Sequence, residues 1–410
     1  MEGFFHVWPI DRVLELVSTL QPVDTEVVPV EACLNRILAE DLISAEDIPG
    51  FHRATMDGFA VQASSTFGAT EANPAYLNLI GSVGMGEVPT IPVGTGEAVR
   101  ISTGGMLPEG ADAVVMLEYA DRIDDILMEV YRSVAPGQNV MMPDEDFRRG
   151  EVLLNAGKRL RPQEIGTLAA LGRMSVRVYR KPRVAIVSTG DEVVPIDCKP
   201  APGQVRDVNS HTLSGFVRST GAEAICLGLV PDVLVELQHR CREALSLADM
   251  VILSGGSSVG MRDLTIEVLE AMPGSRVLLH GIAISPGKPT ILATCGSKLI
   301  WGLPGQVTSA MVVFLKIVRP FLERLCGMDS KTVVRRTIDA TLSRNVASVQ
   351  GRTDFIRVSL RRDGKRWLAD PILGKSGLIH TMMRADGLVE IGIHTEGLDE
   401  GSRVAVELFD

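Results

Sequence analysis

The stretch Asp249-Met-Val-Ile-Leu-Ser-Gly-Gly-Ser-Ser-Val-Gly-Met-Arg-Asp263 joins a short apolar run to a glycine-rich loop and the start of a helical pattern. Residues 250–253 are four consecutive apolar residues, which is typical of a buried strand. The turn from such a strand into a helix gathers backbone N–H groups that can bind an anion. Gly255 and Gly256 lack side chains and would let a ligand reach the backbone. The stretch therefore predicts an anion-binding turn.

The chain on both sides of this stretch alternates between strand and helix patterns from about residue 183 to residue 327. Alternation of this kind predicts a doubly wound, largely parallel α/β sheet, in which ligands bind beyond the carboxyl ends of the strands. We expect strands at 184–188, 224–230, 250–253, 277–284 and 299–302, and helices at 209–220, 232–247, from 263 onward and at 307–325. Asn209 is the expected cap of the first helix, which ends near Gly221.

The regions outside the α/β pattern are mostly β-like, so we expect a multidomain α/β plus β protein. An amphipathic helix is expected at 9–20 and a second at 161–172. Short apolar runs broken by Gly and Pro between 75 and 140 predict a small all-β domain. We expect the two helices to pack together, which would make this β domain an insertion. Residues 328–410 predict a small β-barrel or sandwich.

Composition limits the classes of protein to which the chain can belong. Its 410 residues predict two to four domains, and the formal net charge of −10 argues against nucleic acid or an anionic membrane as the main partner. The sequence contains neither a signal-peptide pattern nor an apolar run near the roughly 20 residues of a membrane span, so we expect a cytoplasmic protein. The six cysteines include no C-x-x-C pair and are expected to be reduced, mostly buried thiols.

Polar clusters follow five of the expected strands and should meet at one edge of the sheet. They are Ser188-Thr-Gly-Asp-Glu192, Asp232, the loop 254–263, Ser285-Pro-Gly-Lys288 and Gly302-Leu-Pro-Gly305. Glycine loops can hold phosphate, and Lys288 offers a positive charge. Glu192, Asp232 and Asp263 are oxygen ligands of the kind that Mg²⁺ prefers. The clusters together predict a site that binds phosphate and a metal.

Each cluster also has a simpler interpretation when it is taken alone. A glycine loop after a strand is more often only a turn, and Asp232 and Asp263 would equally well place negative charge at helix starts. Neither G-x-x-x-x-G-K-[ST] nor an opening G-x-G-x-x-G is present. The expectation of a site therefore depends on the five loops lying together.

The sequences of these loops, and their order along the chain, resemble those of one family. The matching motifs are Met56-Asp-Gly-Phe-Ala-Val61, Ile101-Ser-Thr-Gly-Gly105, Pro108-Glu-Gly-Ala-Asp-Ala-Val114, Ser188-Thr-Gly-Asp-Glu192, Ser254-Gly-Gly-Ser-Ser-Val-Gly260, Pro286-Gly-Lys-Pro289, Gly302-Leu-Pro-Gly305, Gly351-Arg-Thr-Asp-Phe355 and Gly374-Lys-Ser-Gly377. From about residue 10 to the C-terminus the chain resembles the molybdopterin molybdenumtransferases of the MoeA type, the family that includes the E domains of gephyrin and plant Cnx proteins.

The resemblance implies four domains and a homodimer whose active site takes residues from both subunits. The implied domains are an elongated dimerisation domain (1–26 and 145–179), an inserted β-rich domain (27–144), a molybdopterin-binding α/β domain (180–327) and a C-terminal β-barrel (328–410). The implied reaction inserts molybdate into adenylylated molybdopterin with Mg²⁺, releases AMP and yields molybdenum cofactor. A molybdopterin adenylyltransferase would be the upstream donor of the substrate.

The resemblance also assigns roles to residues that match the family motifs. The implied catalytic residues are Asp57, Thr103, Glu192, Asp232, Asp263 and Lys288, with Asp263 holding Mg²⁺ and with Asp57 and Thr103 arriving from the β domain of the partner subunit. The implied substrate-binding residues are Ser254, Gly255, Gly256, Ser257, Pro286, Gly302, Pro304, Gly305, Arg352 and Ser376. Arg352, Ser376 and Lys288 could hold the molybdate oxyanion by charge-assisted hydrogen bonds.

Two departures from the family pattern keep other functions open. Ser285 stands where many relatives carry Lys, and Gln306-Val307 follow Gly305 where relatives commonly read Asn-Pro. The first removes a positive charge near the oxyanion, and tungstate is an alternative to molybdate. The competing functions are a molybdopterin adenylyltransferase, which shares the α/β domain, and a non-catalytic pterin-binding scaffold.

Overall fold

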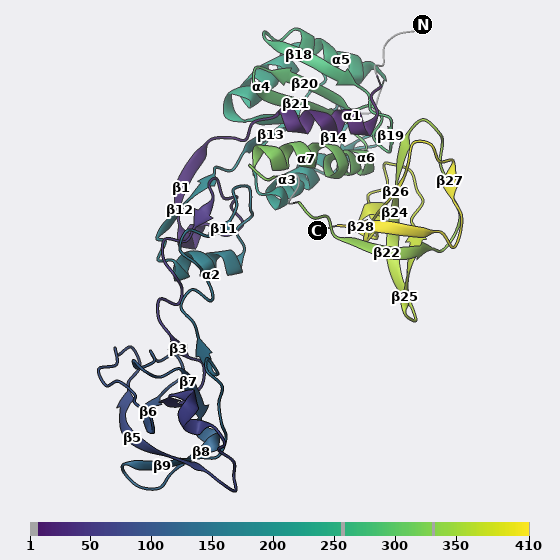
Figure 1. Cartoon of the computed structure of the whole chain (residues 1–410). Helices are drawn as coiled ribbons and strands as arrows, with labels where there is room; N and C mark the ends of the chain where they lie inside the picture. The colour runs from purple at the N-terminus through teal and green to yellow at the C-terminus, as the bar shows by residue number, and fades with distance from the viewer. Residues whose placement is uncertain (1–6, 256–258, 330–332, 410) are drawn as a thin grey trace. The chain divides into compact units, whose positions relative to one another are not determined.

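The computed structural model describes residues 7–255, 259–329 and 333–409, with the backbone alone described for 259–263 (Figure 1). The chain divides into two compact units. One consists of Asp41–Asn155 with Ala169–Gly172, and the other of Met1–Glu40, Ala156–Leu168 and Arg173–Asp410.

The larger unit contains the predicted α/β domain, built on a six-stranded sheet in the order β16-β13-β17-β21-β20-β18. The first four strands are parallel, and β20 and β18 are antiparallel to their neighbours. The doubly wound, largely parallel sheet is therefore confirmed. The strands are β13 (Arg183–Thr189), β16 (Glu223–Val230), β17 (Met250–Ser254), β18 (Ser275–His280), β20 (Ile291–Cys295) and β21 (Lys298–Leu303). The helices are α3 (Asn209–Thr220), α4 (Leu234–Leu247), α5 (Val259–Glu270), α6 (Val307–Val313), the π-helical segment η5 (Phe314–Val318) and α7 (Arg319–Leu325).

Three local expectations in this domain were wrong. The strand expected at 277–284 ends at His280, because Gly281 has a φ of 112° and turns the chain toward another sheet. The helix expected from Asp263 begins four residues earlier, at Val259. Strand β20 (Ile291–Cys295) was not anticipated, and it inserts between β21 and β18.

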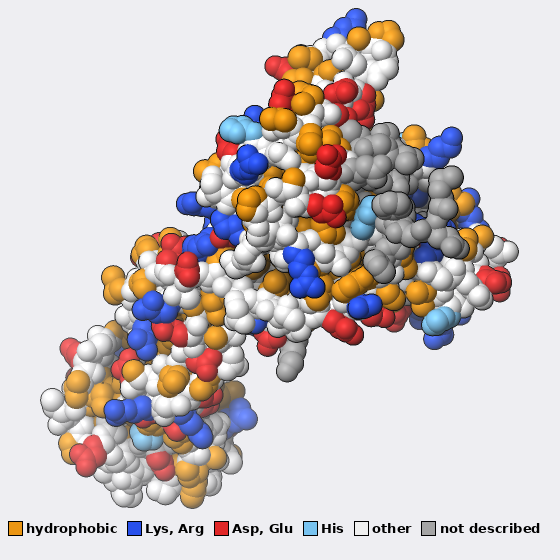
Figure 2. Space-filling view, turned by 90° about the horizontal axis from the view of Figure 1, so that it is seen from above, with side chains coloured by type: hydrophobic (Ala, Val, Ile, Leu, Met, Phe, Trp, Pro, Cys, Tyr) orange, Lys and Arg blue, Asp and Glu red, His pale blue; other side chains and the backbone are white. Residues whose placement is uncertain are grey.

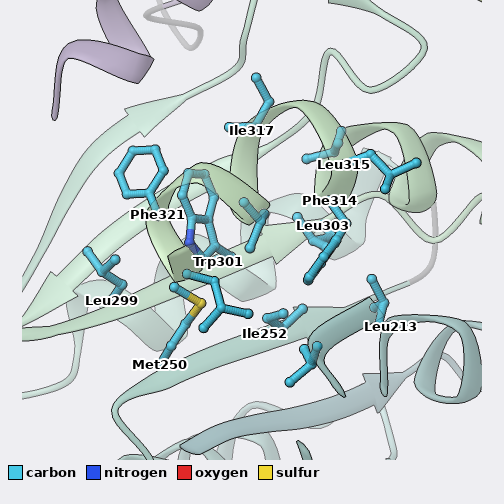
Figure 3. Close-up of a cluster of buried hydrophobic side chains, with 14 of the residues drawn as sticks. Leu213, Met250, Ile252, Leu299, Trp301, Leu303, Phe314, Leu315, Ile317 and Phe321 are labelled. Atoms are coloured by element: carbon cyan, nitrogen blue, oxygen red, sulfur yellow. The ribbon is translucent and has the colours of Figure 1, made fainter. Parts of the chain in front are cut away.

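Two hydrophobic clusters cover the two faces of this sheet, because alternate residues of each buried strand point to opposite faces. On β17, Met250 and Ile252 face one cluster, and Val251 and Leu253 face the other. The first cluster includes Trp301, which packs edge-on against Phe321 of α7 with ring centroids 5.0 Å apart (Figure 3). Helices α3, α6 and α7 contribute to this cluster, whereas α4 and α5 contribute to the other.

The C-terminal part of the larger unit is a closed β-barrel, as predicted, because β24 also pairs with β26. Its strands are β22 (Thr337–Leu342), β24 (Thr353–Asp363), β25 (Arg366–Pro371), β26 (Gly387–Ile391) and β28 (Arg403–Leu408), with the short helix α8 (His380–Met383). The two-residue strand β19 (Ile284–Ser285) of the α/β region adds to β24. Lys316 of η5 donates to Glu407 at 2.6 Å, so an ion pair also joins the helices to the barrel.

The N-terminal helix packs on the α/β domain. It consists of α1 (Ile10–Glu15) and the 3₁₀ turn η1 (Leu16–Thr19), and its buried residues Ile10 and Val13 join the cluster that contains Trp301. Its expected partner, found as α2 (Pro162–Ala170), is not among these contacts, so the expected pairing of the two helices was wrong. An antiparallel pair, β1 (Thr25–Pro29) with β12 (Ser175–Tyr179), joins the two segments instead.

The smaller unit is all-β, as the short apolar runs predicted. Its six-stranded sheet has the order β7-β4-β6-β5-β9-β8. The strands are β4 (Gly58–Val61), β5 (Ala75–Val83), β6 (Glu97–Ile101), β7 (Ala113–Met116), β8 (Ala120–Arg122) and β9 (Leu127–Val130). Two short antiparallel pairs accompany it, β3 (Arg53–Ala54) with β10 (Val140–Met141) and β2 (Leu42–Ile43) with β11 (Val152–Leu154).

The expectation of mostly buried cysteines is only partly met. On the face shown in Figure 2, basic and acidic side chains lie interspersed. All six cysteines are free, but only Cys33, Cys241 and Cys326 are buried, and Cys198 and Cys226 are exposed. Burial raises the pKa of the Cys241 thiol to about 12. None of the helices in the described ranges has both the length and the apolar character needed to cross a membrane.

Candidate functional site

The carboxyl ends of four neighbouring strands place the predicted loops side by side. In the parallel register, Ser188 of β13 lies opposite Ser254 of β17, and Ser254 lies opposite Leu303 of β21. Thr189 is likewise opposite Val230, after which the chain reaches Asp232. The predicted meeting at one sheet edge is confirmed for the loops after β13, β16, β17 and β21, whereas Ser285-Pro-Gly-Lys288 follows β19, which pairs with the barrel strand β24.

The carboxylate of Asp232 is held by two hydrogen bonds at this edge of the sheet. Its Oδ1 accepts a hydrogen bond from Thr189 Oγ1 at 2.5 Å, and its Oδ2 accepts one from the Asp191 N–H at 3.3 Å. Burial raises the pKa of Asp232, and the negative charges of Asp191 and Glu192 raise it further, although the two hydrogen bonds oppose the rise. Glu192 itself is exposed. The local electrostatics would therefore favour a bound cation or proton.

Asn209 ties two of the loops together, a role that the sequence did not indicate. Its Nδ2 donates to Ser254 Oγ at 2.8 Å and to the Gly305 carbonyl at 2.8 Å. The expectation that Asn209 caps α3 was wrong, because Val208 occupies the cap position and Asn209 is the first helical residue. An Asn just before an apolar helical pattern suggests a cap first, and the loops that it contacts come from distant parts of the sequence. The expected helix end at Gly221 is confirmed, with a φ of 105°.

Two site glycines are required by packing against neighbouring residues. A Cβ atom at Gly255 would lie 2.9 Å from Thr189 Cγ2, and one at Gly302 would lie 3.1 Å from Ile291 Cβ. Both distances are shorter than ordinary van der Waals contact, so the adjacent strands leave little room for a side chain. Gly256 and Ser257 lie outside the described residues, as does the side chain of Asp263, whose backbone belongs to α5.

The loop that carries Lys288 lies next to the strand that follows Arg352. Ser285 of β19 pairs with Asp354 of β24, and Pro286 follows directly. Arg352 Nε lies 2.9 Å from Asp354 Oδ1, an ion contact, and its Nη2 donates to Oδ2 at 3.3 Å. Lys288 is exposed at the end of the same loop. The barrel therefore brings the Arg352 segment to the Lys288 segment, as the site prediction requires.

The loop containing Ser376 contacts the start of α6. The Thr308 N–H donates to the Ser376 carbonyl at 3.0 Å. Pro304, Gly305 and the unusual pair Gln306-Val307 directly precede Thr308 in the chain. The Ser376 loop therefore lies beside this segment. In that pair Gln306 is exposed at the helix cap position and Val307 is buried as the first residue of α6.

Asp57 and Thr103 lie in the smaller unit and are in contact with each other. Gly58 of β4 pairs with Ile101 of β6 in antiparallel register, which brings the loop before β4 and the loop after β6 together. The Thr103 N–H donates to Asp57 Oδ1 at 2.6 Å, and this hydrogen bond lowers the pKa of Asp57. Both residues are exposed. Their expected approach to the α/β loops of a partner subunit stays a prediction.

Comparison with known protein families gives matches to three consecutive regions of the chain. Residues 8–172 match the MoeA N-terminal region (domains I and II), residues 185–324 match a probable molybdopterin-binding domain, and residues 339–409 match the MoeA C-terminal region (domain IV). The chain is 32% identical to the molybdopterin molybdenumtransferase of Bacillus subtilis, covering 98% of this chain and 94% of that one. It is 36% identical to that of Haemophilus influenzae, covering 95% of each chain.

A solved structure has the same fold over the whole length. The crystal structure of a molybdopterin biosynthesis MoeA protein from Pyrococcus horikoshii OT3 matches with a TM-score of 0.85 at 32% identity, covering 98% of this chain and 100% of that one. Three family regions in order and near-complete coverage of the relatives therefore agree, and the chain belongs to the MoeA family of molybdopterin molybdenumtransferases.

Proposed function

We propose that this chain completes molybdenum cofactor by inserting molybdate into adenylylated molybdopterin, with release of AMP. The observation that carries the proposal is the convergence of loops at the sheet edge. Asn209 donates hydrogen bonds to both Ser254 and Gly305. The Ser376 carbonyl accepts a hydrogen bond from the first turn of α6, which begins after Gly305. A pterin joined to AMP through a pyrophosphate is an anionic ligand suited to glycine-loop N–H groups.

Positive charge for the oxyanion comes from two segments that pair through β19 and β24. Lys288 is exposed, and the contact with Asp354 limits the orientations available to the Arg352 guanidinium. Molybdate is a tetrahedral oxyanion, so charge-assisted hydrogen bonds from these side chains would position it beside the pterin sulfurs. Ser285 contributes no charge to this group, which leaves anion affinity more dependent on Lys288 and Arg352.

Magnesium is proposed as the metal, with Asp263 as a ligand. Mg²⁺ prefers oxygen ligands and commonly uses one or two carboxylates together with substrate phosphate, which an aspartate beside a phosphate-binding loop would supply. The pKa of Asp232 is raised mainly by burial, with a further contribution from the negative charges of Asp191 and Glu192, and a bound cation would offset both effects. When bound, Mg²⁺ would neutralise charge on the phosphates, and the negative charges of Asp232 and Glu192 would favour the cation in the site.

The proposal extends to the assembly and its setting. A homodimer would let Asp57 and Thr103 of one subunit complete the site of the other, and a molybdopterin adenylyltransferase would supply the substrate in the cytoplasm. The two competing functions are less well supported. The chain matches molybdenumtransferases over nearly their full length, including both β regions that flank the α/β domain.

A defined assay tests the function. Adenylylated molybdopterin, Mg²⁺ and increasing molybdate or tungstate are mixed with the protein, and AMP is measured. We expect oxyanion-dependent AMP release that falls by about 100-fold or more in Asp57→Ala, with the fold and the dimer retained. Asp125→Ala, whose side chain is fully exposed in the same unit, is the matched control.

The outcomes separate the candidates. Wild-type protein that releases no AMP at any oxyanion concentration would refute the proposal. ATP-dependent adenylylation of free molybdopterin would instead support the adenylyltransferase, and pterin binding without turnover would support the scaffold. Full activity in Asp57→Ala would show that Asp57 has no role in the reaction, and the proposed function would still stand.

A further inference from the structure

Asn209 has an unused acceptor at the centre of the loops that it joins. Both Nδ2 hydrogens are committed, one to Ser254 Oγ and one to the Gly305 carbonyl, each at 2.8 Å. The Gly305 carbonyl can only accept, so it fixes the orientation of the amide and assigns Oδ1 to the opposite side. Asn209 is 9% exposed, and its Oδ1 is buried without a hydrogen-bond partner in the described part of the chain. Buried acceptors of this kind are uncommon in folded proteins.

Ser254 provides a donor beside this acceptor. Its Oγ receives the Asn209 hydrogen bond, so the hydroxyl hydrogen points elsewhere. Ser254 is 3% exposed and is the last residue of β17. An unused amide oxygen and an available hydroxyl hydrogen therefore lie on two side chains that are bonded to each other at the carboxyl end of the sheet.

The segment that carries Asn209 is held rigidly. Asp207, which is 7% exposed, accepts hydrogen bonds at 3.1 Å from Ser188 Oγ and from the Ser210 N–H. The start of α3 is thus bonded to the ends of β13 and β17 and to the loop after β21. Such anchoring preorganises Oδ1, so a ligand would not have to order it on binding.

We propose that Asn209 is a substrate-binding residue, whose Oδ1 accepts a hydrogen bond from a ring or exocyclic N–H of a heterocycle while Ser254 Oγ donates to the neighbouring ring acceptor. The assignment rests on the proposed function, because it places a heterocyclic substrate in this site. A lactam edge of a pterin and the amino edge of adenine both present an N–H next to an acceptor, so both share the required chemistry. The pair therefore favours ligands that carry such a heterocyclic edge over sugar phosphates that lack it.

Binding measurements with matched probes test the assignment. Isothermal titration of wild type and Asn209→Ala would use AMP and molybdopterin, and ribose 5-phosphate and inorganic phosphate as probes without the heterocycle. We expect Asn209→Ala to weaken one heterocyclic probe roughly tenfold and to leave ribose 5-phosphate and phosphate within about twofold. A selective loss of affinity for AMP would identify the adenine as the group that Asn209 contacts. A selective loss of affinity for molybdopterin would identify the pterin.

A second variant protects the test against misfolding of the first. Ser254→Ala removes only the hydroxyl, and Ser246→Ala, which removes an exposed serine at the end of α4, is its matched control. Ser254→Ala should reproduce the heterocycle-selective loss, Ser246→Ala should not, and thermal unfolding would show whether each is folded. Equal weakening of all probes, or none, in both variants would overturn the assignment and leave Asn209 as a structural tie alone.

The proposed function fails separately. Wild type that binds heterocyclic probes but releases no AMP in the complete assay would refute the function, and selective loss in the variants would still support the binding residue. Wild type that binds neither AMP nor molybdopterin would refute both. Active wild type with unaltered heterocycle binding in both variants would refute the role of Asn209 alone.

Discussion

Asp232 and Asp57 are both expected site carboxylates, yet the two units hold them in opposite electrostatic environments. In the α/β domain, burial and the charges of Asp191 and Glu192 raise the pKa of Asp232. In the all-β unit, the Thr103 N–H lowers the pKa of the exposed Asp57. The first environment disfavours the ionised form until a cation arrives, and the second keeps the carboxylate ionised in one geometry. Fold topology, rather than residue type, sets this difference.

The loop geometry in each region has a different source. Around Asp232, parallel strands end at one edge and bring together loops far apart in sequence. Around Asp57, a single antiparallel pairing of β4 with β6 is sufficient. The α/β site should therefore tolerate the loss of one contact, whereas the Asp57 contact should depend on one strand pair.

The largest expected effect comes from Gly58, which follows Asp57. A Cβ atom there would lie 1.9 Å from the Val115 carbonyl oxygen, so Gly58→Ala must displace backbone between β4 and β7. We expect a loss of at least about 2 kcal/mol in the stability of the smaller unit. Hydrogen exchange should show faster exchange in β4, β6 and β7, with β13 and β17 unchanged.

Gly166→Ala is the matched control for this substitution. Nothing lies within 4 Å of its Cβ position, and Gly166 is exposed within α2. A gain of about 0.5–1 kcal/mol is expected, because alanine favours the helix. Equal protection of β4 in the Gly58→Ala protein and wild type would contradict the expected displacement of β4, the strand that carries the Asp57 loop, from β7.

A smaller change in folding, but a large one in turnover, is expected for Asp232→Asn. The amide keeps a carbonyl acceptor for Thr189 Oγ1 and removes the charge that Asp191 and Glu192 oppose. We expect AMP release to fall by about 100-fold or more, with a melting temperature at pH 7 no lower than that of wild type. Unchanged turnover would show that the charge of Asp232 is not needed for the reaction. Clear destabilisation would show that this charge does not oppose folding.

The smallest effect is in the pH dependence of the two carboxylates. Because its folded-state pKa is raised, the stability from Asp232 is fully present below its ordinary value of 3.8 and is lost as the pH rises through the folded pKa. The sign for Asp57 is opposite: its contribution is present above 3.8 and is lost as the pH falls through its lowered pKa. Carboxyl carbon shifts in a pH titration should place the Asp57 midpoint below 3.8 and that of Asp232 above it. The reverse order would contradict the contrast.

Much of the α/β domain could be predicted from local patterns. Residues 250–253 and 209–220 formed the expected strand and helix, because consecutive apolar residues and helical periodicity report directly on burial. Strand β20 was missed, and its antiparallel direction depends on pairing between β21 and β18. The packing of α1 was also missed, since an amphipathic face shows that a helix packs but not against what.

The candidate site shows the same division. Loops after strands could be placed on one edge from topology alone, and the family motifs named the residues in them. Asn209 could not be found, because its contacts with Ser254 and Gly305 span 45 and 96 residues and follow no local spacing rule. The opposite pKa directions of Asp57 and Asp232 were equally invisible, since both are aspartates in polar loops.

The sequence by itself determined the strand at 250–253, the alternation around it and the family, because these depend on the order and periodicity of neighbouring residues. Tertiary structure alone decided which loops touch, which carboxylate is buried and which amide is left with an unused acceptor. Those properties depend on distances between residues remote in the chain, and electrostatic and hydrogen-bond energies follow such distances.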